Sequence, residues 1–172
     1  IDSTGLTGPR KPDGSLPDLH FLKLSKTSKL IDKGKDLGFA FNGTAPDLGP
    51  WESDINANGN LYPKIKILTP YDGNKFGDPV NLQINVEAED SDGSIIKVEF
   101  YQGSEKIGEV NNSPWSFTWN NVEEGKYKIR AVAYDNEGAK ATTAFTRINV
   151  LPNTPPTVKI VSRANGSEFS SP

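Results

Sequence analysis

Hydrophobic and polar residues alternate with a period of two through the middle of the chain. Every second position is apolar over residues 80–88, 96–100, 115–119 and 127–133. Because successive side chains of a β-strand point to opposite faces, each stretch predicts a strand with one buried side. Turn-forming sequences separate the stretches, at 90–93, 102–105, 111–114, 120–125 and 135–138. This spacing predicts seven strands over residues 63–151, packed as an all-β sandwich of two sheets.

Two aromatic features refine this sandwich. Trp115, Phe117 and Trp119 lie at alternating positions, so we expect all three rings to face the core. Tyr127 follows the turn that precedes the sixth predicted strand. A tyrosine at this position is expected to bury its ring and to donate its hydroxyl back across the corner.

The start of the sandwich is repeated near the end of the chain. Residues 63–69, Pro-Lys-Ile-Lys-Ile-Leu-Thr, return 93 positions later as residues 156–162, Pro-Thr-Val-Lys-Ile-Val-Ser. A period of this size is the length of one immunoglobulin-type (Ig-type) sandwich. We therefore expect residues 152–172 to contain a linker and the truncated first strand of a second copy. The repeat also indicates that the chain is a piece of a larger modular protein.

The region before the sandwich has a different character. Residues 1–54 contain short apolar runs bracketed by Gly, Pro and Asp, without a sustained helical period. This pattern predicts short strands joined by sharp corners. Residues 55–62, Ile-Asn-Ala-Asn-Gly-Asn-Leu-Tyr, are typical of a linker.

Composition excludes several classes of protein. The net charge is −3 and no Lys/Arg cluster is evident along a helix face or strand, so nucleic-acid binding is disfavoured. The chain has no Cys and one His, His20, which excludes a disulfide, a thiolate metal site and a metal site with several His ligands. Its apolar stretches are too short for a transmembrane helix. We expect a monomer.

Residues 63–151 resemble the bacterial Ig-like modules of secreted carbohydrate-active enzymes. The resemblance lies in the segments Ala-Glu-Asp-Ser-Asp-Gly at 88–93, Ile-Lys-Val-Glu-Phe-Tyr at 96–101, Pro-Trp-Ser-Phe-Thr-Trp at 114–119 and Gly-Lys-Tyr-Lys-Ile-Arg-Ala-Val-Ala-Tyr-Asp at 125–135. It covers the whole predicted sandwich and implies a secreted or cell-surface location.

Residues 1–54 resemble the closing coils of right-handed parallel β-helix proteins, in particular pectate lyases of polysaccharide lyase family nine. The segments that carry the resemblance are 8–18, 30–34 and 45–52, the last reading Ala-Pro-Asp-Leu-Gly-Pro-Trp-Glu. Pro50 and Trp51 replace the Ala and Phe that are usual in this phrase. The resemblance implies a C-terminal β-helix cap and a parent enzyme that cleaves pectate-type polyuronides by calcium-assisted β-elimination. No position matches the catalytic residues of that family, so none is assigned.

Acidic residues suggest a cation site at one end of the sandwich. The loop after the second strand and the loop before the seventh lie at the same end in such folds, which would bring together Asp90, Asp92, Asp135 and Glu137. Asn111 and Asn112 would lie in the adjacent loop. Ca²⁺ prefers carboxylate and amide oxygens, so it is the predicted ion. The alternative is that these residues simply form turns with solvated charges.

Aromatic rings outside the inward pattern are the candidates for sugar binding. Trp51 and Tyr101 are the two such residues, although packing at a domain junction or across strands is the alternative for each. Three functions follow. The first is a non-catalytic spacer of a secreted pectate-lyase-like enzyme that acts on plant cell-wall pectin or polygalacturonate. The second is a carbohydrate- or calcium-binding accessory module, and the third is residual β-elimination activity in residues 1–54.

Overall fold

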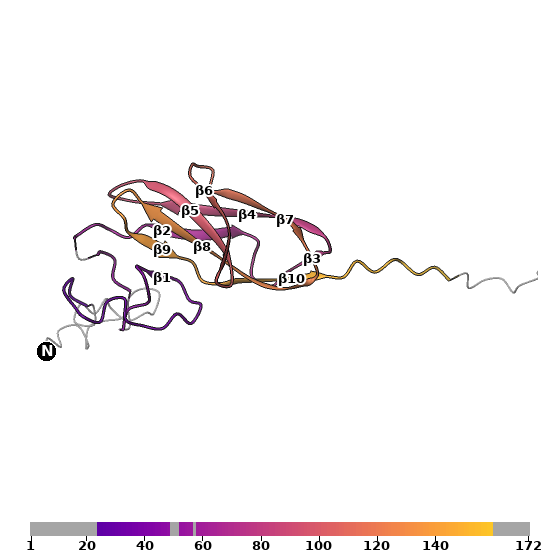
Figure 1. Ribbon diagram of the computed structural model, residues 1–172, viewed down its shortest axis with the longest axis horizontal. Helices are drawn as coiled ribbons and strands as arrows, with labels where there is room; N and C mark the ends of the chain where they lie inside the picture. The colour runs from indigo at the N-terminus through magenta and orange to yellow at the C-terminus, as the bar shows by residue number, and fades with distance from the viewer. Residues whose placement is uncertain (1–23, 49–51, 57, 160–172) are drawn as a thin grey trace, which may run out of the picture.

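Two β-sheets face each other across a hydrophobic core in the computed structural model of the chain, which describes residues 24–48, 52–56 and 58–159 (Figure 1). The smaller sheet is antiparallel, in the order β2 (Lys64–Thr69), β4 (Val80–Glu89) and β7 (Ser116–Val122). None of the described residues forms a helix long and apolar enough to cross a membrane.

The larger sheet is built around β8 (Gly125–Asp135). On one side of β8 lie β5 (Ile95–Gln102) and then β6 (Glu105–Val110). On the other side lie β9 (Lys140–Thr142) and β10 (Thr146–Leu151). Two short strands extend the sheet: β3 (Asn74–Gly77) runs parallel to β10, and β1 (Phe41–Asn42) runs antiparallel to β9.

The chain forms nine strands over residues 64–151, where the alternation predicts seven. The first predicted strand ends before Pro70, which has no N–H to donate, and Gly73 has a φ of 84°. The chain then leaves the smaller sheet and joins the larger one as β3, an additional strand that the alternation does not predict. The last predicted strand is interrupted where the Phe145 amide donates to the Gly38 carbonyl at 3.1 Å, outside the sheet. Both interruptions depend on backbone partners that periodicity does not reveal.

The core confirms most of the predicted inward positions. Phe100 is fully buried and stacks on Phe117 with 5.2 Å between ring centroids, and Phe117 in turn lies against Gly108, where a Cβ would collide with the ring. Trp115, Phe117 and Trp119 all pack against the core but are only partly buried. The other apolar core residues are Leu82, Ile84, Val86, Val98, Val122, Ile129, Ala131, Ala133, Ile148 and Val150.

One inward prediction is wrong. Ile96 is 50% exposed, and its neighbour Ile95 packs against the core instead. The pairing of β5 with β8 shifts register between Ile95 and Lys97, as in a β-bulge, and this exchanges the faces on which the two isoleucines lie.

The predicted tyrosine corner is present. The Tyr127 hydroxyl donates to the Glu123 carbonyl at 3.0 Å, and the ring packs edge-on against Trp119 with centroids 5.1 Å apart. The ring is therefore used for packing while the hydroxyl is satisfied locally.

The described part of the N-terminal region packs on one end of the sandwich. Within residues 24–48 and 52–54 the one regular element is β1, and Phe41 of this strand is buried. Asp36 forms an ion pair with Arg130 of β8, and the Arg130 guanidinium lies 5.0 Å from the Phe145 ring centroid. These contacts attach the segment to β8 and β9. The β-helix cap stays a prediction, and much of the sequence that suggests it lies outside the described residues.

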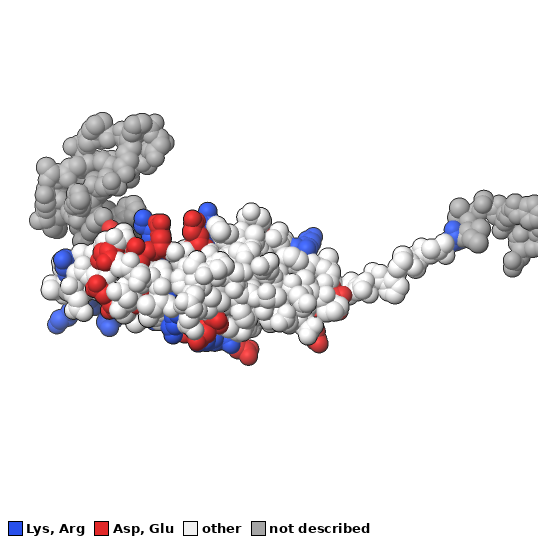
Figure 2. All heavy atoms as spheres, turned by 90° about the horizontal axis from the view of Figure 1, so that it is seen from above, with Lys and Arg blue, Asp and Glu red and all other residues white. Residues whose placement is uncertain are grey.

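The two ends of the described chain lie at opposite ends of the sandwich (Figure 1). Residues 152–159 are exposed and leave the sandwich as an extended tail (Figure 1). On the face drawn in Figure 2, many Asp and Glu side chains lie toward the end of the sandwich that is far from this tail. Most of the predicted second copy falls at residues 160–172, outside the described residues.

Candidate functional site

The β4–β5 and β8–β9 loops lie side by side, as the sequence predicts. The Ser94 amide donates to Asn136 Oδ1 at 2.7 Å, and the Asn136 amide donates to the Ser94 carbonyl at 3.0 Å. Asp90 and Asp92 belong to the first loop, and Asp135 and Glu137 lie at the second. The pairing of the loops therefore brings the predicted acidic residues to one end of the sandwich.

Asp135 has a structural role at this end. Its side chain is 1% exposed, and its Oδ1 accepts from the amides of Glu137 (2.9 Å) and Ala139 (2.8 Å). Its Oδ2 accepts from Asn60 Nδ2 at 2.9 Å. These three donors close the β8–β9 loop and attach residues 55–62 to it. The Glu137 side chain, by contrast, belongs to an exposed residue.

Residues 55, 56 and 58–62 form a small folded unit instead of the open linker that their composition suggests. Ile55 and Leu61 form an isolated antiparallel bridge, and Asn56 Oδ1 accepts from the amides of Asn58 and Asn60. The Leu61 amide donates to Asp92 Oδ2 at 2.9 Å. The acidic loops thus serve as an anchor for the chain that enters the sandwich.

Asp90 differs from the other acidic residues. Both of its carboxylate oxygens are enclosed without a well-formed hydrogen bond, although the Asp92 backbone amide lies close to them. Burial raises the pKa of Asp90, and the neighbouring Asp92 carboxylate raises it further. Within the described residues no three Asp, Glu, His or Cys side chains are arranged to hold a metal ion. Any cation here would therefore need amide, carbonyl or water oxygens in addition to carboxylates.

The side-chain amides at this end of the sandwich belong to residues that the sequence did not single out. Asn60 and Asn136 supply them, whereas Asn111 lies beside Glu109. A side chain from Gly93 would collide with Asn136 and Asp90, so the glycine allows the two loops to approach. Asn60 could not be recognised from the sequence because its partner Asp135 is 75 residues away.

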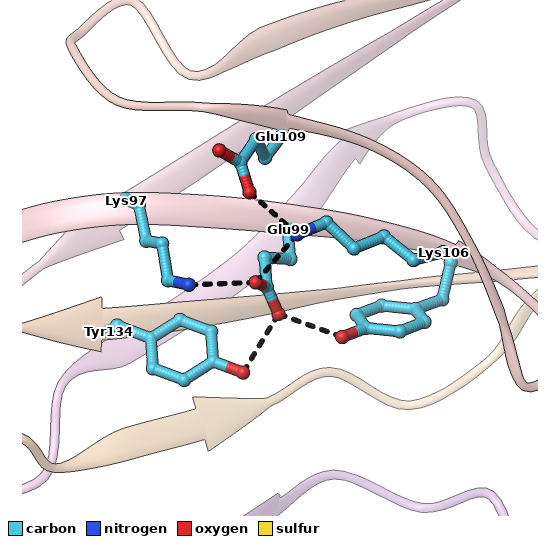
Figure 3. A network of polar contacts seen from close by, with 6 residues as sticks. Lys97, Glu99, Lys106, Glu109 and Tyr134 are labelled. Atoms are coloured by element: carbon cyan, nitrogen blue, oxygen red, sulfur yellow. Dashed lines mark hydrogen bonds and ion pairs between the residues drawn. The ribbon is translucent and has the colours of Figure 1, made fainter.

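A second polar cluster lies on the outer face of the larger sheet (Figure 3). Glu99 is 5% exposed, and its Oε1 accepts from Lys97 Nζ (2.8 Å) and Lys106 Nζ (2.9 Å). Its Oε2 accepts from the hydroxyls of Tyr101 (2.7 Å) and Tyr134 (2.8 Å). Burial alone would raise the pKa of Glu99, but these hydrogen bonds outweigh it and lower the pKa to about 2. Tyr101, a candidate for sugar binding, thus uses its hydroxyl inside this cluster.

Replacing Glu99 with glutamine is expected to destabilise the sandwich by about 1.5–3 kcal/mol at neutral pH, since hydrogen bonds to a charged acceptor are lost. The pKa of Glu99 is lower in the folded state than the ordinary value of 4.5, so its contribution is present above pH 4.5 and declines toward pH 2. Urea unfolding across this range should show the stability difference between wild type and E99Q shrinking as the pH falls. A constant difference would contradict the role of the charge, and Glu105→Gln, an exposed change on β6 outside the cluster, is the matched control.

The segments that carry the lyase resemblance contain three carboxylates that organise the N-terminal region. Asp47 is 9% exposed and accepts from the Asp32 and Ser53 amides, and Asp32 Oδ1 accepts from the Thr44 and Ala45 amides. Glu52 accepts from the Asn42 and Asp47 amides. Burial and the nearby Asp47 and Asp32 carboxylates raise the pKa of Glu52. These acids therefore accept hydrogen bonds from backbone donors at the corners of the segment.

A hollow of about 560 Å³ lies between this segment and the sandwich. Glu52 and Asn42 line it from the N-terminal side, and Tyr62 and Lys64 line it from the start of the sandwich. Trp51, the other candidate for sugar binding, lies outside the described residues, as does His20. Sugar binding by Trp51 or Tyr101 stays a prediction.

The fold and the comparison with family models agree on the class of protein. Residues 63–131 match the model described as Bacterial Ig domain. Both findings support an Ig-like module, and the match to the bacterial Ig model covers residues 63–131 of the sandwich.

Individual relatives match smaller parts of the chain. Pectate lyase L of Dickeya dadantii (strain 3937) and pectate lyase L of Dickeya chrysanthemi are each 42% identical over 53 residues, which is 30% of this chain. The aligned part is 12% of the length of each relative. Among solved structures, the fibronectin(III)-like modules of Clostridium thermocellum CbhA match with 25% identity and a TM-score of 0.48, over 51% of this chain and 94% of theirs.

Proposed function

We propose that this chain is a non-catalytic spacer from a secreted enzyme related to pectate lyases, in which the Ig-like module separates a neighbouring domain from whatever follows. The observation that carries the proposal is the arrangement of the two connections. The N-terminal segment is attached to one end of the sandwich through β1, and the chain continues from the other end. A module with this geometry sets the distance between its neighbours.

The attachment of the N-terminal segment has the chemistry of a fixed junction. It combines backbone pairing of β1 with β9, burial of Phe41 and the Asp36–Arg130 ion pair. Burial by itself would raise the pKa of Asp36. The hydrogen bond from Arg130 outweighs this effect, so the pKa of Asp36 is lowered. A charge-assisted contact of this kind restricts the orientation of the segment as well as its position.

The spacer proposal can be tested by measuring a distance distribution across the junction. The chain has no Cys, so Lys33→Cys and Ser104→Cys allow specific labelling of two exposed positions for fluorescence energy transfer. We expect one narrow distribution, which Asp36→Ala combined with Arg130→Ala should broaden, while Lys66→Ala in the other sheet should leave it unchanged. A broad distance distribution in the labelled chain that keeps Asp36 and Arg130 would overturn the fixed-junction model.

The non-catalytic part of the proposal has its own assay. Polygalacturonate incubated with the chain and calcium is expected to show no rise in the ultraviolet absorbance of unsaturated products. Product formation would instead establish β-elimination activity in this chain. The tested activity is that of the pectate lyase relatives, whose shared part is a small fraction of their length.

Calcium binding at the acidic loop end is a second candidate function. The observation that favours it is the enclosed Asp90 carboxylate, which has no well-formed hydrogen bond from the protein and lies next to Asp92 and Asp135. A cation would offset the repulsion between these carboxylates and would restore the partners that Asp90 lacks. Asn136 Oδ1, on the other side of Gly93, is an additional oxygen.

A calcium titration followed by thermal unfolding tests this candidate. With a dissociation constant of about 0.1–1 mM, typical of extracellular modules, about 5 mM Ca²⁺ should stabilise the fold by about 1–2 kcal/mol. Asp90→Asn should abolish the effect, whereas Glu87→Gln, an exposed change on the preceding strand β4, should retain it. An unchanged melting temperature in millimolar calcium would exclude the site.

A further inference from the structure

Exposed cations are concentrated on one part of the larger sheet, although the sequence shows no evident basic cluster. Lys126 and Lys128 are two residues apart on β8, so both side chains leave the same face. Cross-strand pairing aligns Lys128 with Arg147 of β10, and Asn149 of β10 lies between Lys126 and Lys75 of β3. Four cations from three strands thus form a basic strip, consisting of Lys75, Lys126, Lys128 and Arg147.

The basic strip lies on the outer face of the sheet. All four cationic residues are exposed, while Tyr127, Ile148 and Phe76, the residues that alternate with them, pack toward the core. A hollow of about 280 Å³ is lined by Lys126, Lys128, Arg147 and Asn149 together with Gly73. An added Cβ at Gly73 would meet no atom within 4 Å, so this side of the hollow is open.

Few acidic groups neutralise the strip. Lys75, Lys126 and Lys128 form no ion pair among the residues that the structure describes. Arg147 has one carboxylate partner, Asp72, at 3.7 Å, and both side chains are more than half exposed. Elsewhere on the same sheet face the cations are engaged, with Lys97 and Lys106 on Glu99 and Arg130 on Asp36. The strip therefore differs from its surroundings in having uncompensated positive charge on a chain whose net charge is −3.

We propose that the basic strip binds a linear carboxylated polysaccharide of the polyuronate type. Residues two apart on a strand are about 6.6 Å apart, so the strip presents regularly spaced cations to an extended chain. Each cation can approach a sugar carboxylate, and the Asn149 amide can hydrogen-bond to hydroxyl groups within the hollow. The choice of polymer rests on the proposed function, whereas the requirement for a polyanion rests on the strip alone.

Affinity electrophoresis in gels containing polygalacturonate tests the strip directly, and EDTA in the gel excludes bridging through calcium. We expect the chain to be retarded at low salt and released at high salt. The triple variant Lys126→Gln, Lys128→Gln and Arg147→Gln should bind at least tenfold more weakly, given the usual contribution of each cation at an anionic surface. The control is Lys33→Gln, Lys35→Gln and Lys66→Gln, which removes the same charge from exposed positions elsewhere. Thermal melts should show that both variants remain folded.

Several outcomes would overturn the proposal. Equal weakening in both triple variants would mean that net charge alone causes the retardation. Equal retardation in fully methyl-esterified pectin, which lacks the carboxylates, would remove the charge argument. Stronger, strip-dependent binding to duplex DNA or to vesicles of anionic lipid would assign the strip to another class of partner. These outcomes are independent of the energy-transfer test, so failure here would leave the spacer proposal standing.

Discussion

Replacing Phe100 with alanine is expected to destabilise the sandwich by about 3–5 kcal/mol, the usual cost of truncating a buried aromatic side chain. Phe100 has no exposed surface, and its ring stacks on Phe117, so the change removes apolar burial and leaves a cavity between the sheets. For a domain of this size the melting temperature should fall by at least about 12 °C. Calorimetry or tryptophan fluorescence during heating would measure the change.

Phe39→Ala is the matched control, because the same side chain is truncated at a position that is 73% exposed. We expect an effect within about 0.5 kcal/mol for this variant, as is usual for surface substitutions. If the two variants melted together, the placement of Phe100 at the centre of the core would be wrong.

Replacing Asp135 with alanine is expected to cost about 3 kcal/mol or more. The change leaves the amides of Glu137 and Ala139 and the side-chain amide of Asn60 without their acceptor, and each unsatisfied buried donor costs about 1–3 kcal/mol. The β8–β9 loop should lose its closing hydrogen bonds at the same time. Hydrogen exchange at Glu137 and Ala139 would detect this local change, and denaturant unfolding would give the free energy.

A double-mutant cycle isolates the contact between Asp135 and Asn60. Asn60→Ala alone should have a smaller effect than Asp135→Ala, because it removes one of the three hydrogen bonds. The double variant should be more stable than the sum of the single losses predicts, by about 1 kcal/mol, since groups in contact are not additive. Strict additivity would show that residues 55–62 are not attached to the sandwich through this pair. The exposed Glu137→Gln should be nearly silent in the same assay.

The functional consequences of the two regions differ. At the acidic loop end the carboxylates of Asp92 and Asp135 accept hydrogen bonds from backbone amides, and Asp90 is the candidate ligand of the proposed cation. The basic strip lies on β3, β8 and β10, near the point where the chain continues as residues 152–159. With these charges at separate places, the acidic loops would hold the N-terminal segment in position while the basic strip contacts a polymer.

Local alternation explains why much of the sandwich could be predicted. Inward positions on β4 and β8 recur every second residue, and Tyr127 bonds to a carbonyl four positions earlier. The same reasoning failed at Ile96, where a register shift reverses the faces, and it gave no warning that β3 would leave the first sheet. A bulge or a change of sheet depends on the partner strand, which a single sequence does not contain.

By itself the sequence determined that residues 63–151 form strands with one buried face, that a tyrosine corner closes one turn and that acidic loops share one end. These features depend on neighbours a few residues apart or on the ordinary connectivity of a sandwich. Only the tertiary structure decided that residues 24–48 attach to β8 and β9, that Asn60 meets Asp135, and that cations from three strands form one strip. The physical reason is that these contacts join residues tens of positions apart, and their existence depends on strand order and register.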